Sequence, residues 1–127
     1  GGSKGIGAAV VRELLAHSVT TVIFCSRSPL PQSPVDQDGA INVPQLRSQH
    51  PNSAIHHVQC DVATQDGRQL LFDTISNTLG LKELHGLVNN VGVNTRKPAV
   101  EQTPEEYSTM VRTNMDSAYF VSRLFLP

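Results

Sequence analysis

Apolar side chains recur at helical spacing in three segments of this chain and form short continuous runs in three others. In the first helical segment, Ile6, Val10 and Leu14 repeat every four residues. Val11 and Leu15 widen this apolar stripe. The runs are rich in β-branched and aromatic residues, which is typical of buried strands. The predicted helices span residues 5–18, 65–79 and 104–126. The predicted strands span residues 20–25, 54–60 and 85–89.

The order of these elements predicts the fold class. Strands that alternate with helices form a parallel sheet that is covered by helices on both faces. We therefore predict a Rossmann-type, doubly wound α/β fold over residues 1–127, as a single but incomplete domain. Between the first two strands, residues 28–53 contain five prolines, which predicts a loop with a short helix near 43–49.

The composition argues against several classes of protein. The chain has 127 residues, enough for one domain, and its hydrophobic fraction of 39% is ordinary for a globular protein. The net charge of -1 argues against a nucleic-acid surface, and no apolar run approaches the roughly 18 residues of a membrane span. Cys25 and Cys60 each end a predicted strand and suggest no disulfide framework. We predict two reduced core thiols, no metal site and a cytoplasmic protein.

A glycine-rich loop opens the chain directly before the first predicted helix. Its spacing is G-x-x-x-G-x-G, and the residues that form it are Gly1, Ser3, Lys4, Gly5, Ile6 and Gly7. Without Cβ atoms, a pyrophosphate can approach the backbone, where free N–H groups and the helix dipole favour negative charge. Such a loop needs a strand to enter it, so we expect the first strand of the sheet to precede this chain. A plain tight turn is the alternative for the glycines alone.

The second polar motif follows the strand that ends about twenty residues after the loop. In dinucleotide-binding folds this point meets the adenosine ribose, where an Asp or Glu accepts from the 2′-hydroxyl of NAD. Here no acid is present, and Ser26 and Arg27 offer donors for a 2′-phosphate instead. Lys4 adds a second positive charge from the glycine loop. The alternative for Arg27 is a solvated surface cation.

Two further motifs follow the next strands. Asp61 and Val62 come directly after residues 54–60, where a carboxylate can accept from an adenine amino group or simply cap a turn. The segment Leu87-Val88-Asn89-Asn90-Val91-Gly92 runs from a strand into paired amides and a glycine. Asn89 can tie neighbouring strands together through its side chain, and Gly92 lets backbone approach a ligand beside Val91.

The last helix has a clear start and one unusual residue. Thr103 stands at the N-cap, Pro104 at the first helical position and Glu106 three residues after the cap. The predicted inner stripe is Tyr107, Val111, Asn114, Ala118, Val121 and Phe125. Asn114 lies in the middle of this stripe, and a buried amide is costly unless it is fully hydrogen-bonded.

Together these residues resemble the short-chain dehydrogenase/reductase family. The pattern of that family is T-G-x-x-x-G-x-G, an acid after the third strand, N-N-A-G, and an Asn in the following helix. This chain matches from the first Gly of the pattern, with Val91 in place of the Ala. The stretch from Leu87 to Tyr119 is most similar to the tropinone-reductase-like branch.

The resemblance implies an oxidoreductase that moves a hydride between NADP(H) and a small carbonyl or alcohol substrate. It implies that Asn114 interrupts the hydrogen bonding of its helix and holds a water of the proton relay, as one of four catalytic residues. The other three, a Ser and a Tyr-x-x-x-Lys, are absent, since Tyr107 is followed by Val111 and Tyr119 by Arg123 at the Lys position. It also implies a homo-oligomer through the 104–126 helix, and a substrate entrance beside residues 93–98.

Two alternatives stay open at the level of sequence. A 3-oxoacyl-carrier-protein reductase shares every motif that this chain contains. A non-catalytic NADP-binding module, or a truncated gene product, would share the cofactor motifs without the reaction. A Tyr-x-x-x-Lys motif about 40 residues beyond Asn114, in a longer protein, would favour the enzyme.

Overall fold

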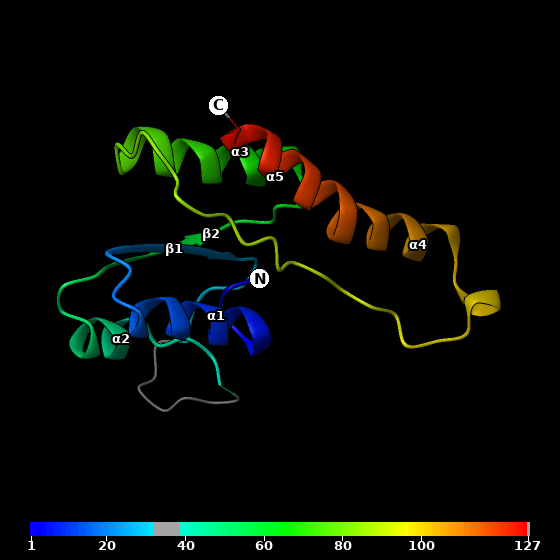
Figure 1. Cartoon of the computed structure of the whole chain (residues 1–127). Helices are drawn as coiled ribbons and strands as arrows, with labels where there is room; N and C mark the ends of the chain where they lie inside the picture. Colours follow the sequence, from blue (N-terminus) through cyan, green and yellow to red (C-terminus); the bar gives the residue numbers. More distant parts are fainter. Residues whose placement is uncertain (32–38, 127) are drawn as a thin grey trace. The chain divides into compact units, whose positions relative to one another are not determined.

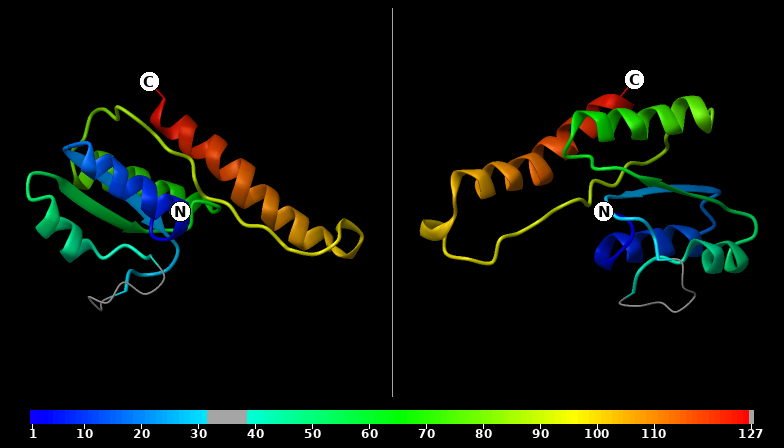
Figure 2. Two further views of the ribbon diagram at one scale, coloured as in Figure 1. Left: turned by 60° about the horizontal axis from the view of Figure 1, so that its bottom comes forward. Right: turned by 180° about the vertical axis from the view of Figure 1, so that it is seen from behind.

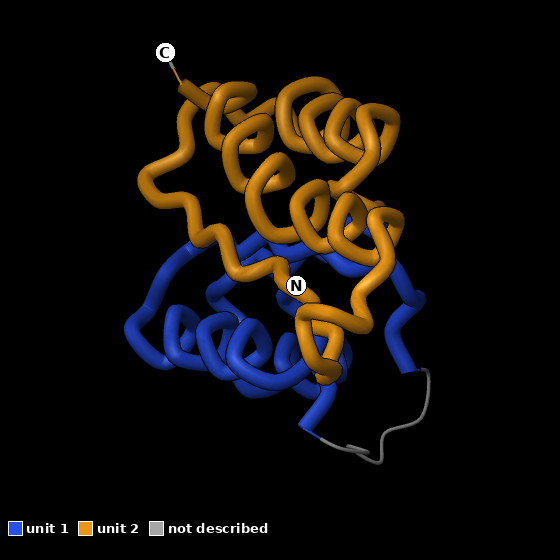
Figure 3. Tube along the Cα trace, turned by 90° about the vertical axis from the view of Figure 1, so that its right-hand side faces the viewer, with its two compact units in different colours: residues 1–60 blue, residues 61–127 orange. Residues whose placement is uncertain are grey.

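The computed structural model describes residues 1–31 and 39–126. The chain divides into two compact units, Gly1–Cys60 and Asp61–Pro127, which Figure 3 shows in different colours. Part of the proline-containing loop predicted at 28–53 lies outside the described residues. The assignment of residues 1–127 to one incomplete domain stays a prediction.

The first unit is a small parallel sheet with two helices on one of its faces (Figure 1). Strands β1 (Thr21–Ser26) and β2 (Ala54–Gln59) pair in parallel, from Thr21 opposite Ala54 to Ser26 opposite Gln59. Helices α1 (Gly5–Ala16) and α2 (Val43–Gln49) pack on this sheet. Their shared core consists of Ala8, Val11, Leu15, Val22, Phe24, Ile41, Leu46 and Ile55. The predicted helices near 5–18 and 43–49, and the first two predicted strands, are confirmed.

The buried face of α1 differs from the main stripe read from the sequence. Ala8, Val11 and Leu15 are buried, whereas Ile6 is 76% exposed and Leu14 is 37% exposed. Ala8, which has little apolar surface of its own, allows the helix backbone to approach the sheet closely. Helix α1 therefore contacts the sheet through the face of Ala8, Val11 and Leu15, and not through the predicted face of Ile6, Val10 and Leu14.

The second unit consists of two long helices and the extended segment that joins them (Figure 2). Its elements are α3 (Gln65–Asp73), η1 (Thr74–Thr78), η2 (Ala99–Glu101), α4 (Pro104–Val111), η3 (Arg112–Asp116) and α5 (Ser117–Phe125). Helix α3 packs against α5, where the rings of Phe72 and Phe125 lie 5.7 Å apart. The guanidinium of Arg68 stacks 4.8 Å from the ring of Phe120. The predicted helices at 65–79 and 104–126 are confirmed, each as an α-helix with a π-helical segment.

The third predicted strand, at 85–89, is not formed. These residues are extended but pair with no strand, since the sheet of the described residues contains only β1 and β2. Leu87 is 42% exposed and Val88 is 59% exposed, as expected for apolar strand residues without a neighbouring strand. A strand is stable only when its N–H and C=O groups join a ladder, and the described part of this chain supplies none here.

Within the described residues, no helix is both long enough and apolar enough to cross a membrane. Cys25 is half-buried and Cys60 is buried, and both are thiols.

Candidate functional site

The glycine loop is attached to the end of β1 and to the segment before α2. The backbone N–H of Gly2 donates to Cys25 O at 3.0 Å, and the N–H of Ile41 donates to Ser3 O at 2.9 Å. A Cβ on Gly2 would lie 2.5 Å from Cβ of Phe24, so only glycine permits this approach. The loop therefore has a fixed position beside the carboxyl end of β1.

The start of α1 is open to a ligand. Gly5 has a φ of +54°, and no atom lies within 4 Å of the place where its Cβ would be. Lys4 is the N-cap residue, and its side chain makes no hydrogen bond to the first turn. The first N–H groups of α1 thus have no side-chain cap, which is the arrangement that favours a phosphate at a helix N-terminus. The predicted loop residues Gly1, Ser3, Lys4, Gly5, Ile6 and Gly7 all lie here.

Ser26 and Arg27 differ sharply in their surroundings. Ser26 is only 6% exposed, and its hydroxyl donates to Ser28 O at 2.8 Å and contacts Nε2 of His57 at 2.7 Å. The Arg27 side chain is exposed and makes no hydrogen bond or ion pair with any residue that the structure describes. Of the two predicted donors, Arg27 is therefore the one that is available to a ligand.

Asp61 begins the turn that leads into α3. Its carboxylate accepts from the Ala63 N–H at 3.0 Å, and its carbonyl accepts from the Thr64 hydroxyl at 2.8 Å. A Cβ on Gly67 would collide with the Asp61 backbone, so Gly67 lets α3 start against this turn. Val62 is buried. These contacts show the turn-forming role of Asp61, and the contact with adenine stays a prediction.

Asn114 is held by the segment that follows the paired amides. Its Oδ1 accepts from the Val93 N–H at 2.8 Å, and its Nδ2 donates to Val93 O at 2.9 Å. The Asn114 amide thus bonds both the N–H and the C=O of Val93, as the backbone of a neighbouring strand would. Gly92 lies directly beside it, with 3.7 Å between Oδ1 and the place of a Cβ. Asn89, predicted as a link between strands, donates instead to the hydroxyl of Ser122 at 2.9 Å.

The expectation that Asn114 is buried in an apolar stripe is wrong for the described structure. Asn114 and Tyr107 are exposed, and the buried residues of this long helix are Thr113, Ser117 and Val121. Asn114 lies within the π-helical segment between α4 and α5, where the regular helical spacing assumed for the predicted stripe does not hold. The requirement that the amide be fully paired is nevertheless met, by Val93.

The π-helical segment η3 interrupts α-helical bonding at Asn114. The N–H of Ser117 bonds to Arg112 O, five residues back, rather than to Thr113 O. The hydroxyl of Ser117 donates to the bypassed Thr113 carbonyl and so satisfies it. Isolated π-helical turns are rare and often occur at functional sites. Ser117 was not singled out from the sequence, because nothing in the sequence signals a π-helical turn.

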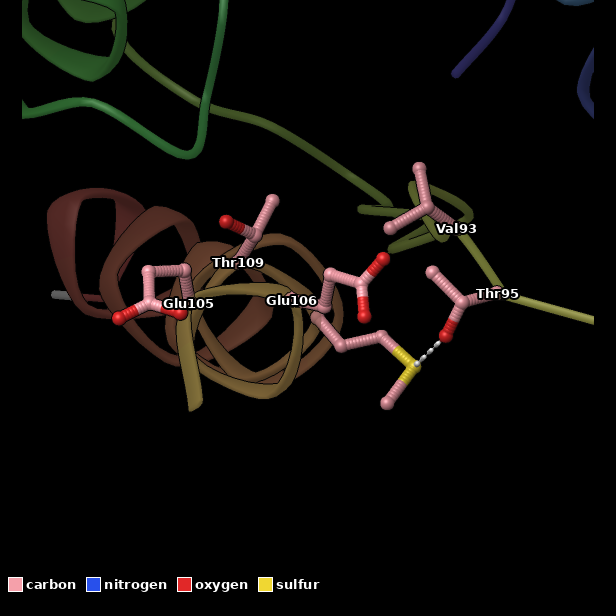
Figure 4. Close-up of a pocket in the computed structure, with 6 residues that line it drawn as sticks. Val93, Thr95, Glu105, Glu106 and Thr109 are labelled. Carbon is pink, nitrogen blue, oxygen red and sulfur yellow. Dashed lines mark hydrogen bonds between the residues drawn. The ribbon is translucent and has the colours of Figure 1, made fainter. Parts of the chain in front are cut away.

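A pocket of about 210 Å³ lies between the extended segment and α4, one turn before Asn114 (Figure 4). The residues that line it are Val93, Thr95, Glu105, Glu106, Thr109 and Met110. The hydroxyl of Thr95 lies 3.9 Å from the sulfur of Met110, as the dashed line in Figure 4 marks. Of the segment 93–98, Val93 and Thr95 line this pocket, and its role as a substrate entrance stays a prediction.

Glu106 fixes the start of α4 beside this pocket. Thr103 accepts from the Glu106 N–H at 3.2 Å, and the Glu106 carboxylate accepts from the Thr103 N–H at 2.9 Å, which completes the predicted capping box. The ammonium of Lys97 lies 2.6 Å from the same carboxylate. The hydrogen bond from Lys97, followed by that from Thr103, lowers the pKa of Glu106 below its ordinary value of 4.5.

We expect the capping box to weaken in acid. The folded state keeps Glu106 ionised, so the unfolded state binds more protons, and stability falls with pH from about 4.5 downward through the lowered pKa. Glu106→Gln is expected to reduce the unfolding midpoint at neutral pH and to flatten its dependence on pH. Thermal unfolding of the whole protein between about pH 3 and pH 7 measures both. The matched control is Glu105→Gln, an exposed neighbour, and an equal loss in this control would contradict the assignment.

The predicted site residues fall into two groups. The glycine loop, Ser26 and Arg27 lie in the first unit, whereas Asp61, Val62, Asn89, Val91, Gly92 and Asn114 lie in the second. Apart from the glycine loop and Asn114, these residues end or follow a strand, or lie in the extended segment that contains the predicted third strand. Sequence reasoning missed His57, which contacts Ser26. His57 is two residues before the register partner of Ser26 and so lies on the same face of the sheet, which the register of the strands reveals and the sequence alone does not.

The structure combines an α/β unit that has a glycine loop at a helix start with an Asn at an interruption of a helix. Comparison with known proteins identifies the family that has these features. The family described as short chain dehydrogenase matches residues 1–127. A tropinone reductase homologue from Arabidopsis thaliana is 36% identical over 128 residues, which cover 100% of this chain and 45% of that protein. Senescence-associated protein 13 of the same plant is 38% identical over 128 residues, which cover 100% of this chain and 43% of that protein.

Solved structures agree on the fold. A short-chain dehydrogenase/reductase variant from Serratia marcescens matches with a TM-score of 0.75 and 25% identity, over 98% of this chain and 46% of that one. L-sorbose reductase from Gluconobacter frateurii matches with a TM-score of 0.77 and 22% identity, over 98% and 43%, and shows the fold alone. The chain belongs to the short-chain dehydrogenase/reductase family, in its tropinone-reductase-like branch, and has an α/β Rossmann fold. It spans less than half the length of these curated relatives.

Proposed function

We propose that the whole protein is an oxidoreductase that transfers a hydride between NADP(H) and a ketone or secondary alcohol. The observation that carries the choice of NADP(H) is Arg27, an exposed guanidinium directly after β1 with no partner among the described residues. A planar fork of N–H donors matches a phosphate, and no carboxylate stands here to accept from a ribose hydroxyl. ElxO, a relative in structure at 26% identity and a TM-score of 0.73, has NADPH bound.

The residues of this chain fit a dinucleotide by their own geometry. The open space above Gly5 and the uncapped first turn of α1 admit a pyrophosphate. Lys4, which is exposed, adds positive charge at that place. The bound nicotinamide supplies the hydride, and the protein positions the substrate and delivers the proton. In the second unit, the residues proposed to contact the cofactor are Asp61, Val62, Asn89, Val91 and Gly92.

Asn114 is proposed as the member of the proton relay that this chain contributes. The backbone of Val93 fixes its side chain through two hydrogen bonds, and in η3 the regular i to i−4 hydrogen bonds of the helix are interrupted. No Tyr of this chain is followed four residues later by Lys, so the proposal places the proton-donating Tyr outside residues 1–127. The pocket beside Val93 and Met110 is proposed as part of the substrate entrance.

The proposed partners are a small carbonyl or alcohol substrate and a second copy of the protein. Tyr107, Met115 and Tyr119, on the helix that runs from α4 to α5, are 60%, 67% and 64% exposed. Aromatic and Met side chains are enriched in interfaces, so we propose pairing through the 104–126 helix. No observation favours a 3-oxoacyl-carrier-protein reductase over the tropinone-reductase-like assignment.

Activity of the purified whole protein tests this function. The expected result is oxidation of NADPH, followed by the loss of its absorbance, with at least one compound from a panel of cyclic ketones. With NADH, kcat/KM is expected to be lower by a factor of about 10 to 100, as one charge-assisted contact to a phosphate predicts. Equal use of NADH would contradict the choice of cofactor. Binding of NADPH without turnover of any ketone or alcohol would indicate a non-catalytic module.

A further inference from the structure

The contact between His57 and Ser26 is partly buried and has no place in the function proposed so far. His57 lies on β2 opposite Phe24, and the two rings are 5.2 Å apart. Its Nε2 lies 2.7 Å from the hydroxyl oxygen of Ser26, the last residue of β1. Burial lowers the pKa of His57 below its ordinary value of 6.5, so the ring is neutral at pH 7 and carries one proton.

The count of protons fixes the direction of this hydrogen bond. The Ser26 hydroxyl has one hydrogen, and the carbonyl of Ser28, at 2.8 Å, can only accept it. His57 must then carry its proton on Nε2 and donate to Ser26. With its hydrogen directed to Ser28, Ser26, a residue that is only 6% exposed, has no proton to give to a phosphate.

The same contacts shape the turn that carries Arg27. The bond from Ser26 to Ser28 O closes the backbone around Arg27. The amide of Gln59 donates to Arg27 O at 3.2 Å, from the residue of β2 that pairs with Ser26. Two side chains of β2, those of His57 and Gln59, therefore hold Ser26 and the backbone of Arg27, from which the guanidinium projects.

We propose that His57 is a positioning residue for cofactor selection, which acts through Ser26 to hold Arg27 where it meets the 2′-phosphate of NADP(H). This inference rests on the proposed function, because it presumes that Arg27 binds that phosphate. His57 itself touches no part of the cofactor. Loss of its N–H frees the Ser26 hydroxyl to rotate and loosens the turn, which weakens the contact between Arg27 and the phosphate and leaves the rest of the cofactor site intact.

Dissociation constants of the whole protein for NADPH and NADH test the inference. His57→Phe keeps a ring beside Phe24 and removes the donor, and we expect about a fivefold weaker affinity for NADPH with that for NADH unchanged, the size of one lost neutral hydrogen bond. His57→Gln places an amide N–H near the position of Nε2 and is expected to restore the preference. The matched control is His56→Phe, which changes the adjacent His on the opposite face of β2 and is expected to change neither affinity.

The outcomes separate this inference from the proposed function. A wild-type protein without preference for NADPH overturns the proposed choice of cofactor, and the role of His57 with it. A wild-type preference that persists in His57→Phe, or an equal loss of both affinities, overturns the role of His57 alone. Nitrogen-15 NMR of the wild-type protein gives a test that needs no variant. The proposal requires the Nε2–H tautomer of His57, and the Nδ1–H tautomer would overturn it.

Discussion

Replacing Arg27 by glutamate is expected to reverse the cofactor preference of the whole protein. The substitution removes the exposed guanidinium after β1 and places a carboxylate where a ribose 2′-hydroxyl can donate to it. Affinity for NADPH is expected to fall by about 100-fold or more, because a charge-assisted contact worth about 1.5–3 kcal/mol becomes a repulsive one. Affinity for NADH is expected to rise severalfold.

Fluorescence titration with the two cofactors measures this change directly. The neutral variant Arg27→Gln is expected to lie between the wild type and Arg27→Glu, because it removes the attraction without adding repulsion. The matched control is Lys82→Glu, which reverses an exposed charge in the second unit. A similar loss of NADPH affinity in this control would mean that net charge matters and the position of Arg27 does not.

Local features of the fold were predictable because their causes are local. The short helix near 43–49 was predicted, and in the structure Asn42 caps it and Pro44 lies in its first turn. The capping box of Thr103 and Glu106 fixes the start of α4 in the same way. Each needs only a side chain and the backbone within three residues of it, so the sequence contains the whole interaction.

Features that depend on distant residues were predicted less well. The segment 85–89 has strand-like residues, but a strand forms only against a neighbour, and pattern alone does not supply one. The face of α1 that is buried depends on how closely Ala8 lets the helix approach the sheet. His57 escaped notice because its importance comes from the register of two strands that are far apart in sequence.

The candidate site shows the same division. The sequence identified Asn114 as a polar residue that requires a partner, and the structure identifies that partner as the backbone of Val93, 21 residues earlier. Amide side chains give no indication of which backbone groups they will bond. The hydrogen bond from the Ser117 hydroxyl to Thr113 O likewise depends on the π-helical segment, which the sequence does not predict.

Replacing Asn114 by alanine is expected to impair both the reaction and the local structure. As a member of the proton relay, Asn114 is expected to support kcat by about 100-fold or more, the usual range for acid–base assistance. Its removal also leaves the N–H and C=O of Val93 to bond with water, because both contacts are exposed, so the free energy of unfolding is expected to fall by about 0.5–1.5 kcal/mol for each hydrogen bond lost. Affinity for NADPH is expected to change less than kcat, because the glycine loop and Arg27, which bind its phosphates in the proposed function, lie in the other unit.

The two effects can be separated with a second substitution. Asn114→Asp keeps an acceptor for the Val93 N–H and loses the donor to Val93 O, so it is expected to recover part of the stability. Ser122→Ala, which removes only the partner of the Asn89 amide, serves as the control for a lost side-chain hydrogen bond elsewhere on the helix.

Steady-state rates and unfolding midpoints, measured on the same samples, distinguish the catalytic role of Asn114 from its structural role. If Asn114→Ala loses stability but keeps kcat within about threefold, Asn114 is a clamp for Val93 and takes no part in proton transfer. If kcat falls by the expected factor while Ser122→Ala remains active, the role of Asn114 in proton transfer is supported.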